Sequence, residues 1–244
     1  MITAENFKIK YSEMDYRLAL KPSSLLNFLQ DIASDNAEKL GFGYSFVSKN
    51  NLGWFLLKYR MEFSEYPVNV EKLLIKTQPR GCNKLFAYRD FIVFDDNKVL
   101  GKIFSCWSLV NLNTKTSVLP QNYIKSEYMQ AYKKLEDDLN FKKIKPLIKI
   151  DIEKEFEIRF DDLDVNSHVN NCNYIIWALE TLDFKFRSLH KIKTVDIYFK
   201  KEVKFGSRIV SQVEFLSDDV TSHVIINKDT NEDLCQIEIV WDKF

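Results

Sequence analysis

The sequence lacks a net charge, a cysteine motif and a long apolar run. Its 244 residues include 35 basic and 35 acidic side chains, so the formal net charge at pH 7 is zero. No whole-protein field draws such a chain to nucleic acid, and we expect no nucleic-acid partner. The four cysteines form no CxxC pair, and no histidine lies at zinc-ligand spacing. We therefore expect reduced thiols, with no metal, cofactor or disulfide framework.

No window of the sequence approaches eighteen uninterrupted apolar residues, and residues 1–13 contain no basic region followed by an apolar run. We expect no membrane span and no targeting segment, hence a cytoplasmic protein. What the chain does have is 45% hydrophobic and 14% aromatic residues. That content is enough to bury a real core and favours β-strands.

Polar chemistry is concentrated in residues 156–180. Asp164, Asn166 and His168 occupy every second position. In an extended loop these side chains would point the same way, so that an acid, an amide and an imidazole converge on one pocket. An Asp- and Asn-rich loop before a helix is equally typical of a turn with a helix cap.

An almost wholly apolar segment, residues 174–179, follows this loop. The absence of a polar stripe predicts a helix buried on all sides. Asn171 or Asn173 can cap its first turn. The unpaired N–H groups of the helix N-terminus would then lie beside His168, where they could hold an oxyanion.

The motifs DLDVNSHVNN (residues 162–171), YxxWxLE (residues 174–180) and KKEV (residues 200–203) occur in this order, and Glu202 follows His168 by 34 residues. Together they resemble the acyl-acyl-carrier-protein thioesterases of plant plastids and bacteria. The resemblance covers nearly the whole chain and implies an α+β fold, a tandem (double) hot-dog in which each antiparallel sheet wraps a long buried helix. It implies hydrolysis of the thioester of fatty acyl-acyl-carrier protein. The partners would be the carrier protein and the fatty acyl chain.

By the same resemblance, the catalytic set is Asp164, Asn166, His168 and Glu202. Glu202 would take a proton from water, His168 would orient that water or share the proton, and Asp164 would fix the imidazole tautomer. Asn166 and a helix N–H would hold the thioester carbonyl. Taken alone, Glu202 is more simply a member of a surface ion-pair cluster with Lys200, Lys201 and Lys204, and the 34-residue spacing from His168 favours the catalytic interpretation instead.

The chain also contains an internal repeat. Residues 6–31 shifted by 149 positions fall on the polar stretch, with Asp15 on Asp164, Arg17 on Asn166 and Ala19 on His168. We predict an N-terminal hot-dog domain of residues 1–125 that binds the acyl chain, a linker of residues 126–150 and a catalytic hot-dog domain of residues 151–244. The expected acyl-binding side chains are Leu26, Phe28, Leu29, Trp54 and Phe55.

Local signals place further elements. Pro22 begins a helix that runs to about Leu40, apolar all round, and Gly41 ends it. Strand-like runs follow in each half, and a polar helical piece is expected near residues 123–139. Lysines 142, 143 and 145 in the linker form a solvated face or help to dock an acidic carrier protein.

Many plant members of the resembled family carry a cysteine directly after the glutamate, whereas this chain has Val203. We therefore expect catalysis without a thiol nucleophile and read Cys172 as a packing residue. His190 and His223 read as ordinary surface or strand residues.

The alternative functions are an acyl-CoA thioesterase or hydroxyacyl dehydratase of the hot-dog class, and a non-catalytic acyl-ligand binder. The sequence reveals neither the acyl chain length nor the oligomeric state, and a homodimer is one option.

Overall fold

The computed structural model describes residues 2–125 and 127–244. The chain forms two compact units by its internal contacts. The first comprises the residues up to Leu20 with Asn27–Asn140, and the second comprises Lys21–Leu26 with Phe141–Phe244. The predicted domain start at residue 1 and linker start at residue 126 lie outside the described residues. The rest of the expected linker is divided between the two units rather than standing apart.

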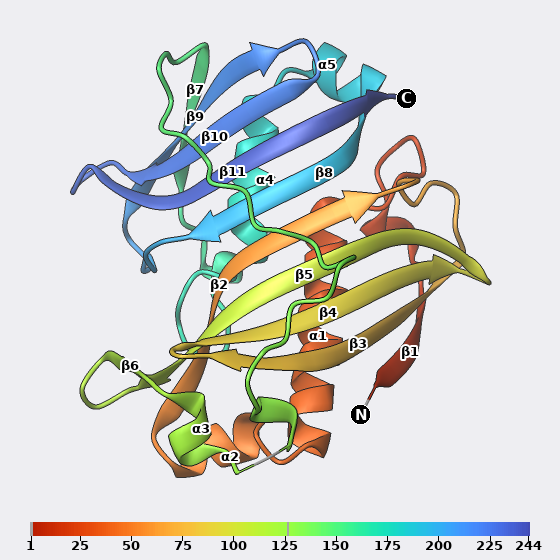
Figure 1. Cartoon of the computed structure of the whole chain (residues 1–244). Helices are drawn as coiled ribbons and strands as arrows, with labels where there is room; N and C mark the ends of the chain where they lie inside the picture. The colour runs from red at the N-terminus through yellow and green to blue at the C-terminus, as the bar shows by residue number, and fades with distance from the viewer. Residues whose placement is uncertain (1, 126) are drawn as a thin grey trace. The chain divides into compact units, whose positions relative to one another are not determined.

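The first unit is built on an antiparallel sheet (Figure 1). In spatial order its strands are β1 (Thr3–Lys8), β3 (Lys72–Asn83), β4 (Phe86–Asp95), β5 (Lys98–Asn111) and β2 (Leu52–Phe63), and β6 (Thr116–Val118) pairs with β5. Burial alternates along β4, where the side chains of Ala87, Phe91 and Val93 are buried. Such alternation gives the sheet one apolar face. The four strand runs predicted in this half are confirmed.

One long helix, α1 (Pro22–Lys39), belongs to this half of the chain. Pro22 stands in its first turn, and Gly41 (φ +81°) follows its end, so both predicted boundary signals are confirmed. Leu29 and Ile32 are fully buried, whereas Asp31 and Asp35 are exposed. The helix is therefore amphipathic, and the expectation that it is apolar all round was wrong.

The second unit repeats the arrangement. Its strands are, in spatial order, β8 (His190–Phe199), β11 (Glu232–Lys243), β10 (Val220–Asn227), β9 (Arg208–Ser217) and β7 (Ile152–Glu157). The helix α4 (Cys172–Thr181) packs against β7, β9, β10 and β11, and only Glu180 in it is exposed. The prediction of a helix buried on all sides is confirmed here. A short helix, α5 (Phe184–Leu189), follows and is capped by Asp183, whose carboxylate accepts from the N–H of Phe186 at 2.6 Å.

The segment after β6 differs from the prediction. Its described residues hold only a short helix α3 (Pro120–Tyr123) and a 3-10 turn η2 (Glu127–Met129), and residues 130–139 form no helix. Long-range contacts take the place of a helix. The N–H of Tyr132 donates to the carbonyl of Cys82 at 2.9 Å, and Arg80 pairs with Asp138 at 2.8 Å and also with Asp90.

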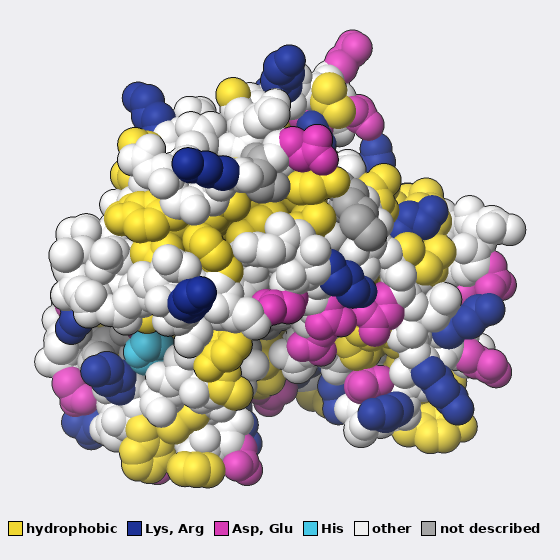
Figure 2. All heavy atoms as spheres, turned by 90° about the horizontal axis from the view of Figure 1, so that it is seen from below, with side chains coloured by type: hydrophobic (Ala, Val, Ile, Leu, Met, Phe, Trp, Pro, Cys, Tyr) yellow, Lys and Arg dark blue, Asp and Glu magenta, His cyan; other side chains and the backbone are white. Residues whose placement is uncertain are grey.

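Each unit thus combines an antiparallel sheet with a helix, and the fold is the predicted α+β tandem hot-dog. The second helix is much the shorter, with 10 residues in α4 against 18 in α1. Basic and acidic side chains are interspersed on the face shown in Figure 2. None of the helices within residues 2–125 and 127–244 is long and apolar enough to cross a membrane.

Candidate active site

The polar motif forms a tight loop rather than an extended one. Oδ1 of Asp164 accepts from the backbone N–H of Asn166 at 2.8 Å and of His168 at 3.1 Å. Ser167 takes a left-handed conformation (φ 61°), and Leu163 pairs with Val169 across the base of the loop. Aspartate commonly closes turns in this way. The expected alternation of side chains in an extended loop was therefore wrong.

The first unit contains the same loop, which confirms the internal repeat. Oδ1 of Asp15 accepts from the N–H of Arg17 at 2.8 Å and of Ala19 at 3.1 Å, and Leu18 has φ 61°. Arg17 also binds the Asp15 carboxylate through its guanidinium at 2.8 Å. Burial raises the pKa of Asp15, but the bonds from Arg17 outweigh it and the net pKa is lowered. This carboxylate is therefore engaged by a cation that the second loop lacks.

The second loop brings His168 to Glu202. Nδ1 of His168 lies 3.3 Å from Oε1 of Glu202, and the two side chains are 30% and 46% exposed. The backbone joins the same segments, because the N–H of Val169 donates to the carbonyl of Val203 at 3.4 Å. The imidazole thus faces Glu202, whereas Oδ1 of Asp164 holds the loop backbone. Asn166 is exposed on the turn.

The electrostatics of Glu202 differ from those of an ordinary surface carboxylate. Partial burial raises its pKa, and the negative charge of Asp164 raises it further, while His168 and Lys204 lower it. The net pKa is raised. Glu202, His168 and Asp164 therefore interact as one cluster, and a raised pKa brings a carboxylate closer to the working range of a general base.

The lysines beside Glu202 have other partners. Lys200 pairs with Asp233 at 2.8 Å, and Lys201 pairs with Glu232. Glu202 itself faces His168. The surface ion-pair interpretation therefore describes Lys200 and Lys201 but not Glu202.

The start of α4 is capped differently from the prediction. The side-chain oxygen of Asn170 accepts from the N–H of Cys172 at 3.1 Å, and its carbonyl accepts from the N–H of Asn173 at 2.9 Å. Asn171 makes no side-chain cap bond, and the Asn173 amide donates to the carbonyl of Asp162 at 2.9 Å. Asn170 is thus the capping residue. The first two helical N–H groups are already bonded, so the oxyanion role expected of the helix N-terminus has no support at these positions.

The thiol of Cys172 is a poor candidate nucleophile. Its side chain is 7% exposed, and burial, aided by the charge of Asp162, raises its pKa to about 11. Thiolate reactivity requires a lowered pKa. All four cysteines, including Cys172, are free and buried. Val203, at the position of the plant-type cysteine, is also buried.

The predicted acyl-binding side chains do not share one surface of the first unit. Phe28 stacks on Phe7 with 4.7 Å between ring centroids, and Leu29 is fully buried. Trp54 packs into the core and donates its indole N–H to the carbonyl of Phe42 at 2.9 Å. Phe55 follows it in β2 and so projects from the opposite face of the sheet. Phe55 and Trp54 therefore cannot line one interior within this unit. Leu26 is buried, and its contacts place it in the second unit.

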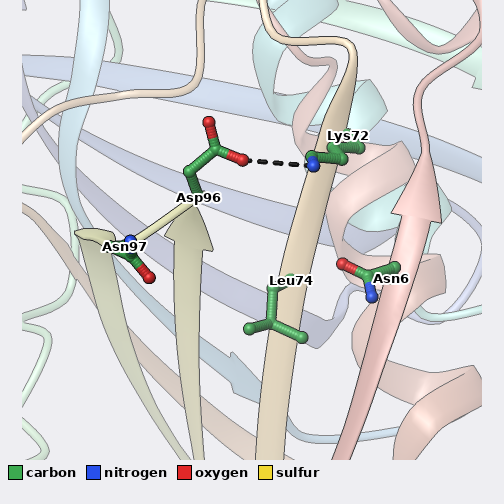
Figure 3. A pocket seen from close by; sticks show the side chains of 5 residues that line it. All are labelled: Asn6, Lys72, Leu74, Asp96 and Asn97. Carbon is green, nitrogen blue, oxygen red and sulfur yellow. Dashed lines mark ion pairs between the residues drawn. The ribbon is translucent and has the colours of Figure 1, made fainter.

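A surface pocket lies elsewhere, at the edge of the first sheet (Figure 3). It is lined by Asn6, Lys72, Leu74, Asp96 and Asn97. The Lys72–Asp96 pair spans 3.2 Å between exposed side chains. An ion pair between exposed side chains contributes little to stability. None of the predicted site residues is among those that line this pocket.

His223 is a strand residue, as predicted. This side chain is fully buried in β10, with Nε2 2.9 Å from Oγ1 of Thr221 and Nδ1 unpaired among the described residues. Burial lowers its pKa to about 3. His190 begins β8 and stacks on Phe186. Among the described residues, neither histidine contacts Glu202, His168 or Asp164.

Comparison with known proteins settles the family. The profile of the acyl-ACP thioesterase N-terminal domain matches residues 1–132, and that of the C-terminal domain matches residues 146–243. The chain belongs to the acyl-ACP thioesterase family. A chloroplastic oleoyl-acyl carrier protein thioesterase from Coriandrum sativum is 24% identical over 215 residues, which cover 81% of this chain and 58% of that protein. The chain thus spans less than two thirds of the length of such a relative.

Solved structures of this thioesterase family show the same fold. An acyl-ACP thioesterase from Bacteroides thetaiotaomicron superposes with a TM-score of 0.84 at 23% identity, covering 99% of this chain and 98% of that one. A 12:0-ACP thioesterase from Umbellularia californica superposes with a TM-score of 0.86 at 19% identity, covering 100% and 98%.

Sequence reasoning missed the first-unit counterpart of Glu202. The N–H of Leu20 donates to the carbonyl of Pro67 at 3.0 Å, as Val169 does to Val203, so Pro67 occupies the place of Val203 and Tyr66 that of Glu202. A single offset of 149 residues could not find this match, because the two units differ in length between the loop and this segment. The predicted catalytic set of the second unit therefore corresponds to an aspartate, an arginine, an alanine and a tyrosine in the first.

Proposed function

We propose that this chain hydrolyses the thioester of fatty acyl-acyl-carrier protein and releases a free fatty acid and the carrier protein. The observation that carries the proposal is the 3.3 Å contact between His168 and Glu202, next to Asp164, in a chain of the acyl-ACP thioesterase family. Both side chains are partly exposed, which leaves them within reach of water and of a thioester.

In the proposed reaction, Glu202 takes a proton from water, and the water oxygen bonds to the carbonyl carbon. The carbon–sulfur bond then breaks, and the leaving thiolate receives the proton held by the Glu202–His168 pair. Asp164 keeps the loop closed through its bonds to the backbone, so its role here is to place His168. Asn166, exposed on the same loop, donates to the thioester carbonyl.

The domain roles belong to the same proposal. The second unit performs the chemistry, since the first unit has Ala19 and Tyr66 where the second has His168 and Glu202. The first unit holds the acyl chain, and the buried face of α1 with Leu29 and Phe28 supports this role. We place the protein in the cytoplasm, which suits four unpaired thiols.

Acyl-carrier protein is the proposed substrate carrier. The hydroxyl of Tyr198 near the end of β8 donates to the carbonyl of Lys142, so the lysine-rich strap of residues 142–145 is held next to the strand that leads to Glu202. Lys142, Lys143 and Lys145 are exposed, whereas Lys200 and Lys201 are engaged in ion pairs. We therefore assign the docking of an acidic carrier to the strap lysines and Lys204.

The test is a hydrolysis panel of acyl-carrier-protein and acyl-CoA thioesters of graded chain length. We expect turnover of carrier-bound acyl chains, with higher kcat/KM than the CoA thioester of the same chain, and loss of turnover in His168→Ala and Glu202→Gln proteins that keep their circular dichroism. Equal use of both donors would favour an acyl-CoA thioesterase. Binding of acyl thioesters without any hydrolysis would favour a non-catalytic acyl binder.

A further inference from the structure

Glu202 lies on a stretch without regular structure. Residues 200–204 form no strand, and the glutamate side chain is half exposed. A carboxylate on such a stretch needs other groups to fix its backbone if it is to stay 3.3 Å from His168.

Tyr174 supplies such a group from the first turn of α4. Its side chain is 3% exposed, and its hydroxyl donates to the carbonyl of Lys201 at 3.4 Å. Burial raises the pKa of this phenol, and a hydrogen bond from the backbone N–H of Val203 acts in the opposite direction. One hydroxyl thus donates to the carbonyl before Glu202 and accepts the N–H after it.

Neighbouring aromatic rings hold this hydroxyl in place. The Tyr174 ring meets Trp177 at 5.4 Å and 69°, and meets Phe199 at 5.6 Å and 80°, both edge to face. Aromatic pairs of this geometry are favourable and restrict the ring. The position of the Tyr174 oxygen is therefore set by the packing of α4 against the end of β8.

The first unit serves as an internal control. There the N–H of Leu20 donates to the carbonyl of Pro67, as the N–H of Val169 donates to the carbonyl of Val203 in the second unit. Both units therefore have this backbone hydrogen bond. However, the 149-residue offset places Leu25 where Tyr174 stands, and Pro67 has no N–H to donate. The first unit closes its loop with a different hydroxyl, because Tyr66 donates to the carbonyl of Leu20 at 2.8 Å. In the second unit the hydroxyl comes from the helix and holds the carbonyl that precedes Glu202.

We propose that Tyr174 is a positioning residue that holds Glu202 against His168. This inference rests on the proposed thioester hydrolysis and adds a residue that acts through Glu202 rather than on the substrate. Loss of the hydroxyl frees the backbone on both sides of the glutamate, so that its carboxylate samples more of the solvent and spends less time at the imidazole.

The main variant is Tyr174→Phe, which deletes the hydroxyl and keeps the ring. Tyr66→Phe is the matched control, because it also removes a buried phenol that donates to a backbone carbonyl, that of Leu20, in the unit without His168 and Glu202. We expect kcat of Tyr174→Phe to fall about tenfold or more with KM within about twofold, since small displacements of catalytic groups are costly. Tyr66→Phe should keep kcat close to that of the unmodified protein.

The pH profile of kcat separates positioning from a loss of folded protein. Burial raises the pKa of Glu202, so a carboxylate that samples more solvent should have a pKa closer to its ordinary value. The acid limb of the Tyr174→Phe profile should therefore move to lower pH. If the variant merely contained less folded protein, its apparent kcat would be lower by the same factor at every pH, and the shape of the profile would not change.

A second variant, Val203→Pro, places a proline where the first unit has Pro67. It removes the backbone N–H that the Tyr174 hydroxyl accepts and keeps the hydroxyl itself. It should lower kcat and shift the acid limb in the same direction. Unchanged kcat in Tyr174→Phe, beside an inactive Glu202→Gln, would overturn the positioning role and leave the proposed function intact. If the unmodified protein hydrolysed no acyl thioester, both the proposed function and the positioning role of Tyr174 would be refuted.

Discussion

The burial of His223 predicts a measurable dependence of stability on pH. The folded protein holds this imidazole neutral, with a pKa of about 3, whereas an unfolded chain protonates histidine near pH 6.5. The stabilising effect of the neutral form is fully present above pH 6.5 and is lost as the pH falls from 6.5 toward 3. Each unit of pH in this window removes at most about 1.4 kcal/mol, so His223 alone should cost about 3 kcal/mol of unfolding free energy at pH 4.5 relative to pH 7.5.

The test variant is His223→Phe. The strand pairing supports this choice: β10 pairs His223 with Val213, and β4 of the first unit pairs Phe91 with Thr77 at the corresponding place. Phe91 is 1% exposed, so the repeated scaffold accepts phenylalanine there. In the unmodified protein Oγ1 of Thr221 also accepts the indole N–H of Trp241 at 2.9 Å, so we expect Thr221 to keep a partner in this variant.

Unfolding free energies from urea titrations at pH 7.5 and 4.5 give the comparison. Other carboxylates and histidines titrate in both proteins and cancel in the difference. The unmodified protein should lose about 3 kcal/mol more than His223→Phe between the two pH values. A His190→Phe protein controls for the removal of a histidine as such. Parallel losses in the unmodified protein and His223→Phe would show that His223 is not held neutral by its burial.

The remaining predictions concern activity. His168→Ala and Glu202→Gln should each lower kcat by at least about a hundredfold, since acid–base assistance is worth that much; near-normal turnover in a folded variant would refute the assigned site. Replacing all four cysteines by Ser or Ala should leave kcat within about severalfold for the folded fraction, because burial keeps the pKa of Cys172 near 11; an acyl group trapped on Cys172 would contradict this. At low carrier-protein concentration, turnover should fall as salt rises, and Lys142→Ala with Lys143→Ala should weaken that dependence; a salt response identical to that of the acyl-CoA substrate would count against docking by these lysines. Leu29→Ala should change the profile of acyl chain lengths more than Phe55→Ala does, because the two side chains lie in different environments; identical profiles would argue against an acyl site under α1.

The sequence by itself determined the parts that depend on neighbours along the chain. Pro22 and Gly41 mark the ends of α1 because a proline suits the first helical turn and a glycine tolerates the left-handed conformation after the last. The alternation of apolar residues gave the strands, and the offset of 149 residues gave a loop that the structure repeats in both units. The unbroken apolar character of residues 174–179 likewise predicted the buried helix α4.

Tertiary structure decided which distant groups meet. Glu202 reaches His168 because the segment after β8 joins Val169 through the backbone, and no pattern within either motif specifies that contact. The same pairing identifies Tyr66 as the counterpart of Glu202, which a fixed sequence offset hides. The burial of His223 and the engagement of Lys200 and Lys201 by acidic residues of β11 also depend on strand register. Register is set by long-range packing of the sheet, whereas helix ends and turns are set by hydrogen bonds within a few residues, so the elements could be predicted from the sequence and their meeting at the site could not.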